Sequence, residues 1–276
     1  MQIGNKEFQF DQTHTYIMGI LNVRPDSLSD GGRFQKKDAA LAHVEEMVEQ
    51  GVDLVDVGGE STRPGYQKIS IQEETDRVCQ MIEAVKSRFD IPVSIDTYKA
   101  PVMEAALSAG ADLANDIWGL RYEKFFGQRC QEDIWSGETM AQVIARHQVP
   151  VCIMHNRSTA EYQEFLAEMI SDLEDSISIA ESAGIKRSQM ILDPGVGFAK
   201  SYEQNLQVLA HLDQFQKLEL PLLLAASRKS VIGLTLDLPV DQREEGTLVT
   251  SILAGIHHWQ MIRVHDVEKN RRAIQM

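Results

Sequence analysis

The sequence lacks long hydrophobic runs. It contains no uninterrupted apolar stretch of about 18 residues, the length that a transmembrane helix needs. The first residues, MQIGNKEFQFDQTH, scatter polar side chains among apolar ones and have no apolar core of the signal-peptide type. We therefore expect a cytoplasmic protein with no membrane partner.

Cysteine is scarce. Cys79, Cys130 and Cys152 lie far apart, and their spacing matches neither a zinc site nor a redox-active pair. Reduced thiols are the ordinary state of such cysteines inside the cell. We expect no disulfide framework.

Positive charge is also in short supply. The 27 Lys and Arg residues face 41 Asp and Glu residues, which gives a net charge of −14. A field of this sign repels nucleic-acid phosphates, so a nucleic-acid partner is not expected. A small anionic substrate is still compatible, because a few local basic residues can outweigh the global charge.

What the sequence does contain is a regular alternation of short β-rich runs and longer amphipathic segments. Runs such as YIMGILNV and LLLAAS are almost continuously apolar, as in parallel strands that are buried on both faces. The predicted strands cover residues 15–22, 53–58, 91–96, 112–117, 150–155, 190–193, 221–226 and 261–264. The clearest predicted helices cover residues 38–50, 72–88, 100–109, 139–148, 161–183, 202–217 and 243–258.

This alternation predicts an α/β fold. Eight βα units within a chain of this length fit a (β/α)8 TIM barrel, which typically needs about 250 residues, better than a doubly wound sheet. We predict one domain that spans residues 1–276. The helix at 72–88 has the clearest start signal, because a serine precedes an acidic first turn.

Polar residues follow the predicted strands one after another. Because the carboxyl ends of barrel strands meet on one face, these side chains are expected to converge on a catalytic site. Each of them alone could instead cap a turn, but a shared place at successive strand ends favours a site. The residues are Asn22, Asp96, Asn115, Asp193, Lys229, Arg263 and His265.

The motifs around these residues resemble one family. NVRPDSLSDGG, DLVDVGGESTRPG, SIDTYK, NDIWG, LDPGVGF, SRKS and RVHD occur in this order over about residues 15–270. The series is similar to that of the dihydropteroate synthases. The resemblance implies a transferase of folate biosynthesis that joins a dihydropterin methyl pyrophosphate to para-aminobenzoate, with Mg²⁺ assisting and pyrophosphate leaving.

The resemblance also implies a pterin pocket. A carboxylate and an amide suit the donor-and-acceptor edge of a pterin, and the candidates are Asp96, Asn115 and Asp193. We expect Lys229 to bond to the pterin ring. The apolar walls would come from Met154, Ile117 and Phe198. For Asp96 and Asp193, capping of the turn that follows is the alternative.

The leaving diphosphate calls for a cationic clamp. Arg263 and His265 alternate along one predicted strand end and therefore face the same way, and Arg63 adds a further cation. The amide oxygen of Asn22 suits Mg²⁺, which the family holds with such an asparagine. A buried core histidine is the alternative interpretation of His265. We name Asp96, Lys229, Arg263 and His265 as the catalytic set.

The para-aminobenzoate pocket is expected to include Thr62, Pro64 and Ser230, with two loops closing over the site. The sequence departs from the family in the first loop, where Arg24 replaces threonine and Leu28 replaces phenylalanine. Leucine keeps apolar contact with the aminobenzoate ring but loses aromatic stacking. We hypothesise weaker binding of para-aminobenzoate and weaker inhibition by sulfonamides.

Two other interpretations stay open. A catalytically impaired pterin-binding paralogue would explain the changes at Arg24 and Leu28, and a pterin-dependent methyltransferase-like barrel would share part of the motif series. The long segment at residues 120–140 either covers the site or is a tolerated surface insertion. The resemblance further implies a homodimer whose partners are otherwise small-molecule substrates.

Overall fold

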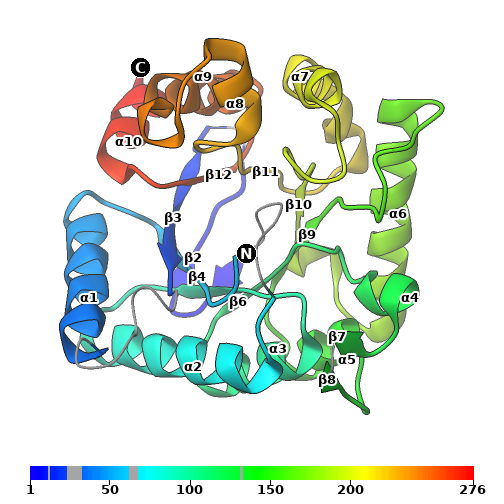
Figure 1. The fold of residues 1–276 in the computed structure, drawn as a ribbon. Coiled ribbons are helices and arrows are strands. Elements are labelled where there is room, and N and C mark those ends of the chain that lie inside the picture. Colours follow the sequence, from blue (N-terminus) through cyan, green and yellow to red (C-terminus); the bar gives the residue numbers. More distant parts are fainter. Residues whose placement is uncertain (12, 24–32, 62–67, 131–132) are drawn as a thin grey trace.

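The computed structural model describes residues 1–11, 13–23, 33–61, 68–130 and 133–276 (Figure 1). The predictions for Arg24, Leu28, Thr62, Arg63 and Pro64 lie outside these residues. No helix in the described ranges is both long enough and apolar enough to cross a membrane.

The described residues form an eight-stranded parallel sheet that curls into a barrel. Its strands are β3 (Tyr16–Asn22), β4 (Leu54–Gly58), β5 (Val93–Asp96), β6 (Leu113–Asp116), β9 (Val151–Met154), β10 (Met190–Asp193), β11 (Leu223–Leu224) and β12 (Met261–Val264). They are ordered β10-β9-β6-β5-β4-β3-β12-β11, and a parallel bridge between Leu192 and Leu222 brings the two ends of the sheet together. The predicted TIM barrel and its eight strands are confirmed.

Helices surround the strands (Figure 1). They are α1 (Arg33–Glu49), α2 (Ile71–Arg88), α3 (Ala100–Ser108), α4 (Tyr122–Phe126), α5 (Met140–His147), α6 (Phe165–Ala183), α7 (Tyr202–Ala210), α8 (Ser230–Leu236), α9 (Glu244–Ile256) and α10 (Val267–Gln275). Ser70 caps α2 by accepting a hydrogen bond from the Glu73 backbone, as its sequence predicts. The helix predicted over 202–217 is wrong in one respect. It breaks at His211, whose φ of −129° is not helical, and continues as a 3₁₀ helix.

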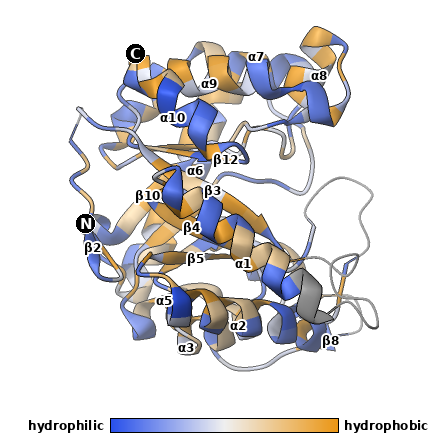
Figure 2. Cartoon of the chain, turned by 90° about the vertical axis from the view of Figure 1, so that its left-hand side faces the viewer, coloured by the Kyte–Doolittle hydropathy of each residue, from blue (hydrophilic) through white to orange (hydrophobic). Residues whose placement is uncertain are grey.

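The interior of the barrel is arranged in an apolar layer below a polar one. Leu54, Leu113, Ile191 and Met261 belong to one buried cluster inside the barrel. Successive strand residues alternate between the two faces, so the residues two positions further along these strands point into the same interior. Those residues are Asp56, Asn115, Asp193 and Arg263. The strands are mainly orange, hydrophobic, in Figure 2.

An N-terminal hairpin closes the other end of the barrel. The short strands β1 (Gln2–Ile3) and β2 (Lys6–Glu7) pair antiparallel. Ile3 and Phe8 are fully buried and pack into the apolar cluster of the barrel interior. The Phe8 ring lies 4.7 Å from the ring of Tyr16, at the start of β3. The hairpin therefore closes the amino end of the barrel, and the carboxyl end stays available for a site.

The long segment after β6 packs beside that end. Its described residues form α4 and the two-residue strands β7 (Arg129–Cys130) and β8 (Asp133–Ile134). Tyr122, Cys130 and Trp135 are buried in a cluster with Ile117 and Met154, two of the predicted site residues. The described part of the segment therefore supports the wall of the site from behind.

Candidate active site

A cavity of about 370 Å³ opens at the carboxyl ends of the strands. Its lining contains every predicted site residue that the structure describes. These are Asn22, Asp96, Asn115, Ile117, Met154, Asp193, Phe198, Lys229, Ser230, Arg263 and His265. Asp96 pairs with Asn115 across β5 and β6, and Asp193 pairs with Met154 across β10 and β9, so one side of the cavity is a continuous series of strand ends.

Arg263 is held between two carboxylates. Its Nε donates to Asp56 Oδ2 at 2.6 Å, and its Nη2 donates to Asp96 Oδ2 at 2.8 Å. Burial lowers the pKa of the guanidinium, but the two carboxylates outweigh that effect and raise it. The planar fork of the guanidinium therefore has a fixed orientation in the cavity wall and keeps its charge.

Asp56 is a functional candidate that the motif series does not single out. It is fully buried, and its Oδ2 also accepts a hydrogen bond from Asn115 Nδ2 at 3.2 Å. This contact leaves Asn115 Oδ1 as the acceptor for a ligand. A signal was present in the sequence: a carboxylate two residues after Leu54 in an apolar strand faces the barrel interior.

Asp96 combines burial with an unused oxygen. Burial raises its pKa to about 7, while Arg263 acts in the opposite direction and Asp56 raises the pKa further. Within the described ranges, Asp96 Oδ1 is buried and has no hydrogen-bond partner. A buried acceptor without a partner costs folding free energy, and a ligand that donates a hydrogen bond would remove that cost.

Asp193 and Lys229 face the same cavity. Asp193 Oδ1 accepts from the Gly195 backbone N–H at 2.7 Å, so the residue caps its turn as well as lining the cavity. Lys229 Nζ donates to the Val196 carbonyl and lies 4.8 Å from the centre of the Phe198 ring. Burial lowers the pKa of Lys229 to about 8, opposed by Asp193. An amine whose pKa lies close to neutral pH can donate a hydrogen bond to a carbonyl and can also exchange a proton.

His265 and Ser230 complete the opposite side. His265 Nδ1 lies 2.9 Å from Ser227 Oγ, and the side chain is only partly buried and lines the cavity beside Arg263. The predicted shared face of Arg263 and His265 is confirmed, and the core-histidine interpretation is not supported. Ser230 is the first residue of α8, where backbone N–H groups lack helical acceptors.

A buried ion triad fixes the segment that follows β4. Lys99 is fully buried, and its Nζ lies 2.9 Å from Glu60 Oε2 and 2.8 Å from Glu74 Oε2. Tyr98 donates a second hydrogen bond to Glu60 at 2.8 Å. Burial lowers the pKa of Lys99, but the two carboxylates outweigh it and raise the pKa. Because Glu60 lines the cavity, the triad connects the cavity edge to α2 and α3.

The space around Asn22 suits a hard cation. Asn22 ends β3, is exposed and lines the cavity. A Cβ atom at Gly58 would be in ordinary contact with Asn22 Oδ1 and with Asp96 Oδ2, each at 3.8 Å, so both oxygens border the same position beside the glycine. Amide and carboxylate oxygens are ligands that Mg²⁺ accepts beside water and phosphate. No cluster of three or more His, Cys, Asp or Glu ligands exists within the described ranges, so the protein alone would supply few ligands.

Known proteins are similar to this chain in fold and in sequence. Residues 18–265 match the family model described as "Pterin binding enzyme". A dihydropteroate synthase of Clostridium beijerinckii is 50% identical over 277 residues, which cover 100% of this chain and 97% of that protein. The crystal structure of a Clostridium difficile dihydropteroate synthase in the presence of pteroic acid has a TM-score of 0.87 and 45% identity, covering 96% of each chain. The Xanthomonas albilineans dihydropteroate synthase with 4-aminobenzoic acid has a TM-score of 0.84 and 38% identity, covering 96% of this chain and 92% of that one.

The barrel with its polar strand ends and the family match define a pterin-binding enzyme. The matches cover nearly the full length of this chain and of these relatives. The chain belongs to the dihydropteroate synthase family, a family of transferases.

Proposed function

We propose that this protein condenses 6-hydroxymethyl-7,8-dihydropterin pyrophosphate with para-aminobenzoate to give 7,8-dihydropteroate and pyrophosphate, a step of folate biosynthesis. One observation carries the proposal. Asp96, Asn115 and Asp193 surround a single cavity that Lys229 and Arg263 also line. Family membership supports the same reaction, and solved relatives are described with pteroic acid and with 4-aminobenzoic acid.

The pterin would bind along the strand ends from β5 to β10. Asp193 would accept from the 2-amino and N3 edge, and Asn115 Oδ1 and Asp96 Oδ1 would accept further N–H groups. Lys229 would donate to the pterin carbonyl. Met154, Ile117 and Phe198 line the cavity and would hold the flat ring. A hydrogen bond from the ligand offsets the cost of burying a carboxylate, which favours a pterin orientation with its N–H groups toward Asp96 and Asp193.

The reaction breaks the bond between the pterin methylene carbon and the diphosphate oxygen, and forms a carbon–nitrogen bond to the arylamine. Positive charge develops on the pterin, where Asp96 and Asp193 would stabilise it. Negative charge develops on the leaving diphosphate, where Arg263 and His265 would stabilise it. The neutral arylamine attacks with its lone pair and releases one proton, which leaves with the diphosphate or with solvent. A strong general base is not needed for this route.

Mg²⁺ would be held at Asn22, with water and diphosphate oxygens as its other ligands. When bound, it would neutralise charge on the leaving group. The oxygens of Asn22 and Asp96 beside Gly58 support this placement.

Para-aminobenzoate would bind on the side of Ser230, with its carboxylate at the first turn of α8. Leu28, Thr62, Arg63 and Pro64 would complete this pocket. We retain the hypothesis that Leu28 weakens the binding of para-aminobenzoate and of sulfonamides, because leucine cannot stack on an aromatic ring.

A homodimer is supported by the outer face of α9. Val249, Ile252 and Ile256 are exposed by 57%, 40% and 65%, and their spacing places them on one face of the helix. Exposed apolar faces of this kind often mark contacts between subunits. Analytical ultracentrifugation of the protein and of Val249→Asp checks this point: we expect a dimer that the charge weakens, and a monomeric wild type would contradict the proposal.

An assay separates the synthase from the two alternatives. Purified protein is mixed with the pterin pyrophosphate, labelled para-aminobenzoate and Mg²⁺, and labelled dihydropteroate is measured. We expect product together with an equal amount of pyrophosphate. Tight pterin binding without product would instead favour the impaired paralogue, and methyl transfer from a methylated pterin would favour the methyltransferase-like barrel.

A further inference from the structure

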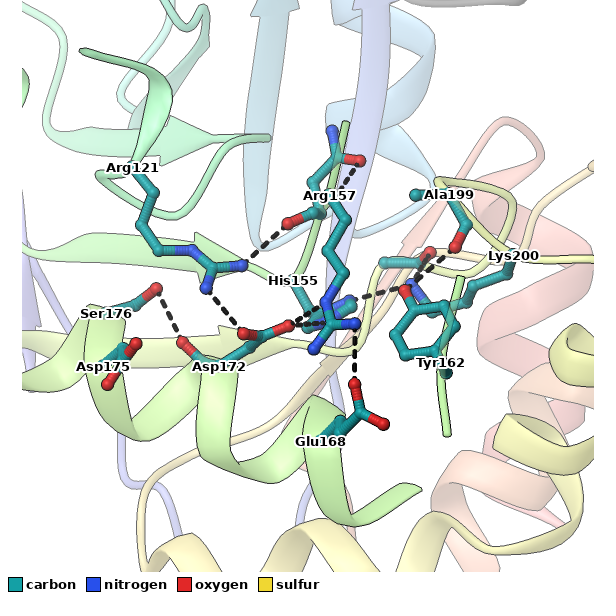
Figure 3. A network of polar contacts seen from close by, with 12 residues as sticks. Arg121, His155, Arg157, Tyr162, Glu168, Asp172, Asp175, Ser176, Ala199 and Lys200 are labelled. Carbon is teal, nitrogen blue, oxygen red and sulfur yellow. Dashed lines mark hydrogen bonds and ion pairs between the residues drawn. The ribbon is translucent and has the colours of Figure 1, made fainter. Parts of the chain in front are cut away.

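A buried polar network lies behind the pterin side of the cavity, outside the residues assigned so far. Figure 3 shows His155, Arg121 and Arg157 converging on Asp172, with Lys200 on the other side of His155. Asp172 belongs to α6, His155 follows β9, and Lys200 ends the loop between β10 and α7. The network thus joins an outer helix to the loop that carries Phe198.

Lys200 uses its ammonium group to hold this loop. Its Nζ donates to the Gly195 carbonyl at 3.0 Å and to the Phe198 carbonyl at 2.9 Å, and it lies 3.0 Å from His155 Nδ1. An ammonium has three N–H donors and no acceptor, so these contacts use all of them. Two of the three partners are backbone carbonyls of the same loop, on either side of Gly197.

His155 has a defined hydrogen-bonding state. Because Nδ1 accepts from Lys200, the ring proton lies on Nε2, which donates to Asp172 Oδ2 at 3.0 Å. The side chain is fully buried, and burial together with Lys200 lowers the His155 pKa to about 3. Arg121 donates to Asp172 Oδ1 at 2.9 Å. His155 therefore stays neutral. It connects Lys200 to Asp172 through one hydrogen bond at each ring nitrogen.

The opposite side of the loop is held by cavity residues. Asp193 accepts from the Gly195 N–H, and Lys229 donates to the Val196 carbonyl. The loop also passes so close to β9 that a Cβ at Gly195 would lie 2.1 Å from the His155 carbonyl oxygen. Cavity contacts on one side and Lys200 on the other thus determine where Phe198 stands.

We infer that Lys200 and His155 are positioning residues for pterin recognition, which set the Phe198 wall and the Asp193 turn from outside the cavity. This inference rests on the proposed function. Arg121, Arg157 and Asp172 are absent from the cavity lining, so the network acts on the ligand through the loop. Among the described residues, Ser230 on α8 forms no hydrogen bond or ion pair with this network. The affinity for para-aminobenzoate is therefore expected to be independent of the network.

The buried position of Lys200 is costly for a charged group. Burial lowers its pKa to about 7, opposed by Asp193, so an ammonium at this place is less stable than one in water. A methionine of similar length would avoid that desolvation cost.

The test is a comparison of Lys200→Met, His155→Asn and His155→Gln by steady-state kinetics and thermal unfolding. Asparagine keeps an acceptor near the Nδ1 position, whereas glutamine keeps a donor near the Nε2 position. We expect Lys200→Met and His155→Gln to raise the KM for the pterin pyrophosphate by about tenfold or more, as loss of a charge-assisted hydrogen bond would. The KM for para-aminobenzoate should stay within about twofold, and His155→Asn should lie closer to wild type. Lys124→Ala, an exposed lysine paired with Asp175 of α6, is the control.

Three results would overturn the inference. They are an unchanged pterin KM in Lys200→Met, an equal rise in both KM values, and loss of folding in all three variants, which would assign the network to stability alone. A wild type that forms no dihydropteroate would contradict the proposed function instead. The two failures are therefore distinguishable.

Discussion

Arg263 Nη2 donates to Asp96 Oδ2 at 2.8 Å, and this ion pair joins the ends of β12 and β5 across the mouth of the barrel. Arg263, which we expect to bind the diphosphate, thus contacts Asp96, which we expect to bind the pterin. Asp56, buried beneath them, holds the same guanidinium. The two halves of the site are therefore connected before any substrate binds, and Arg263 is oriented without the ligand.

Asp96 should make the stability of the free enzyme depend on pH. Its folded-state pKa of about 7 exceeds its ordinary value of 3.8, so the folded state holds its proton more tightly. The stabilisation is present in full below about pH 4 and is lost as the pH rises through about 7. Asp96→Asn removes this dependence. Its Tm relative to wild type, measured by scanning calorimetry, should be higher at pH 8 than at pH 5. If the Tm difference between the variant and the wild type is the same at both pH values, the pKa of Asp96 is not raised in the folded state.

Removal of Arg263 should damage both stability and catalysis. Arg263→Ala leaves Asp56 and Asp96 buried without their cation, and loss of one partner from a buried pair costs about 3–5 kcal/mol. Loss of a charge that stabilises the leaving group is expected to reduce kcat/KM by about 100-fold or more. Urea unfolding and steady-state assays measure the two effects. The control is Arg272→Ala, which removes an exposed pair with Glu268 and should change neither.

The triad of Lys99, Glu60 and Glu74 after β4 should stabilise the folded state. Lys99→Met leaves Glu60 and Glu74 facing each other in a buried site, so we expect a loss of about 3–5 kcal/mol. Equilibrium unfolding of this variant is compared with Arg88→Ala, which removes an exposed contact with Glu45 and should cost less than about 1 kcal/mol. Similar values for the two variants would contradict the role given to the triad.

Leu28→Phe tests the departure of the first loop from its family. Restored aromatic stacking is worth about 0.5–1.5 kcal/mol, which corresponds to roughly a 2- to 13-fold change in affinity. The KM for para-aminobenzoate and the inhibition constant of a sulfonamide should both fall by a factor in this range. If both constants stay unchanged, the aromatic residue has no part in binding here.

The sequence predicted the barrel and the cavity lining well because both depend on periodic features. A strand that is buried on both faces gives a continuous apolar run, and the polar residue that ends it shares an edge with its neighbours. Asn22, Asp96, Asn115 and Asp193 were predicted in this way and line one cavity. The roles of the individual residues stay predictions.

Other features depend on contacts that no local pattern contains. Asp56 lies inside an apolar strand, and only the two-residue step from Leu54 shows that it faces the interior. Lys200 and His155 lie 45 residues apart, and packing of the β10–α7 loop on β9 brings them together. The predicted helix also breaks at His211, where the backbone φ of −129° is not helical.

The central claim is that Asp193 and Lys229 form the pterin site of a dihydropteroate synthase. The most direct measurement is the rate of dihydropteroate formation by Asp193→Ala and by Lys229→Ala, with circular dichroism to verify that both fold. We predict that each variant keeps the native spectrum and loses turnover, while the wild type forms one dihydropteroate for each pyrophosphate released. Full activity in either folded variant would contradict the account.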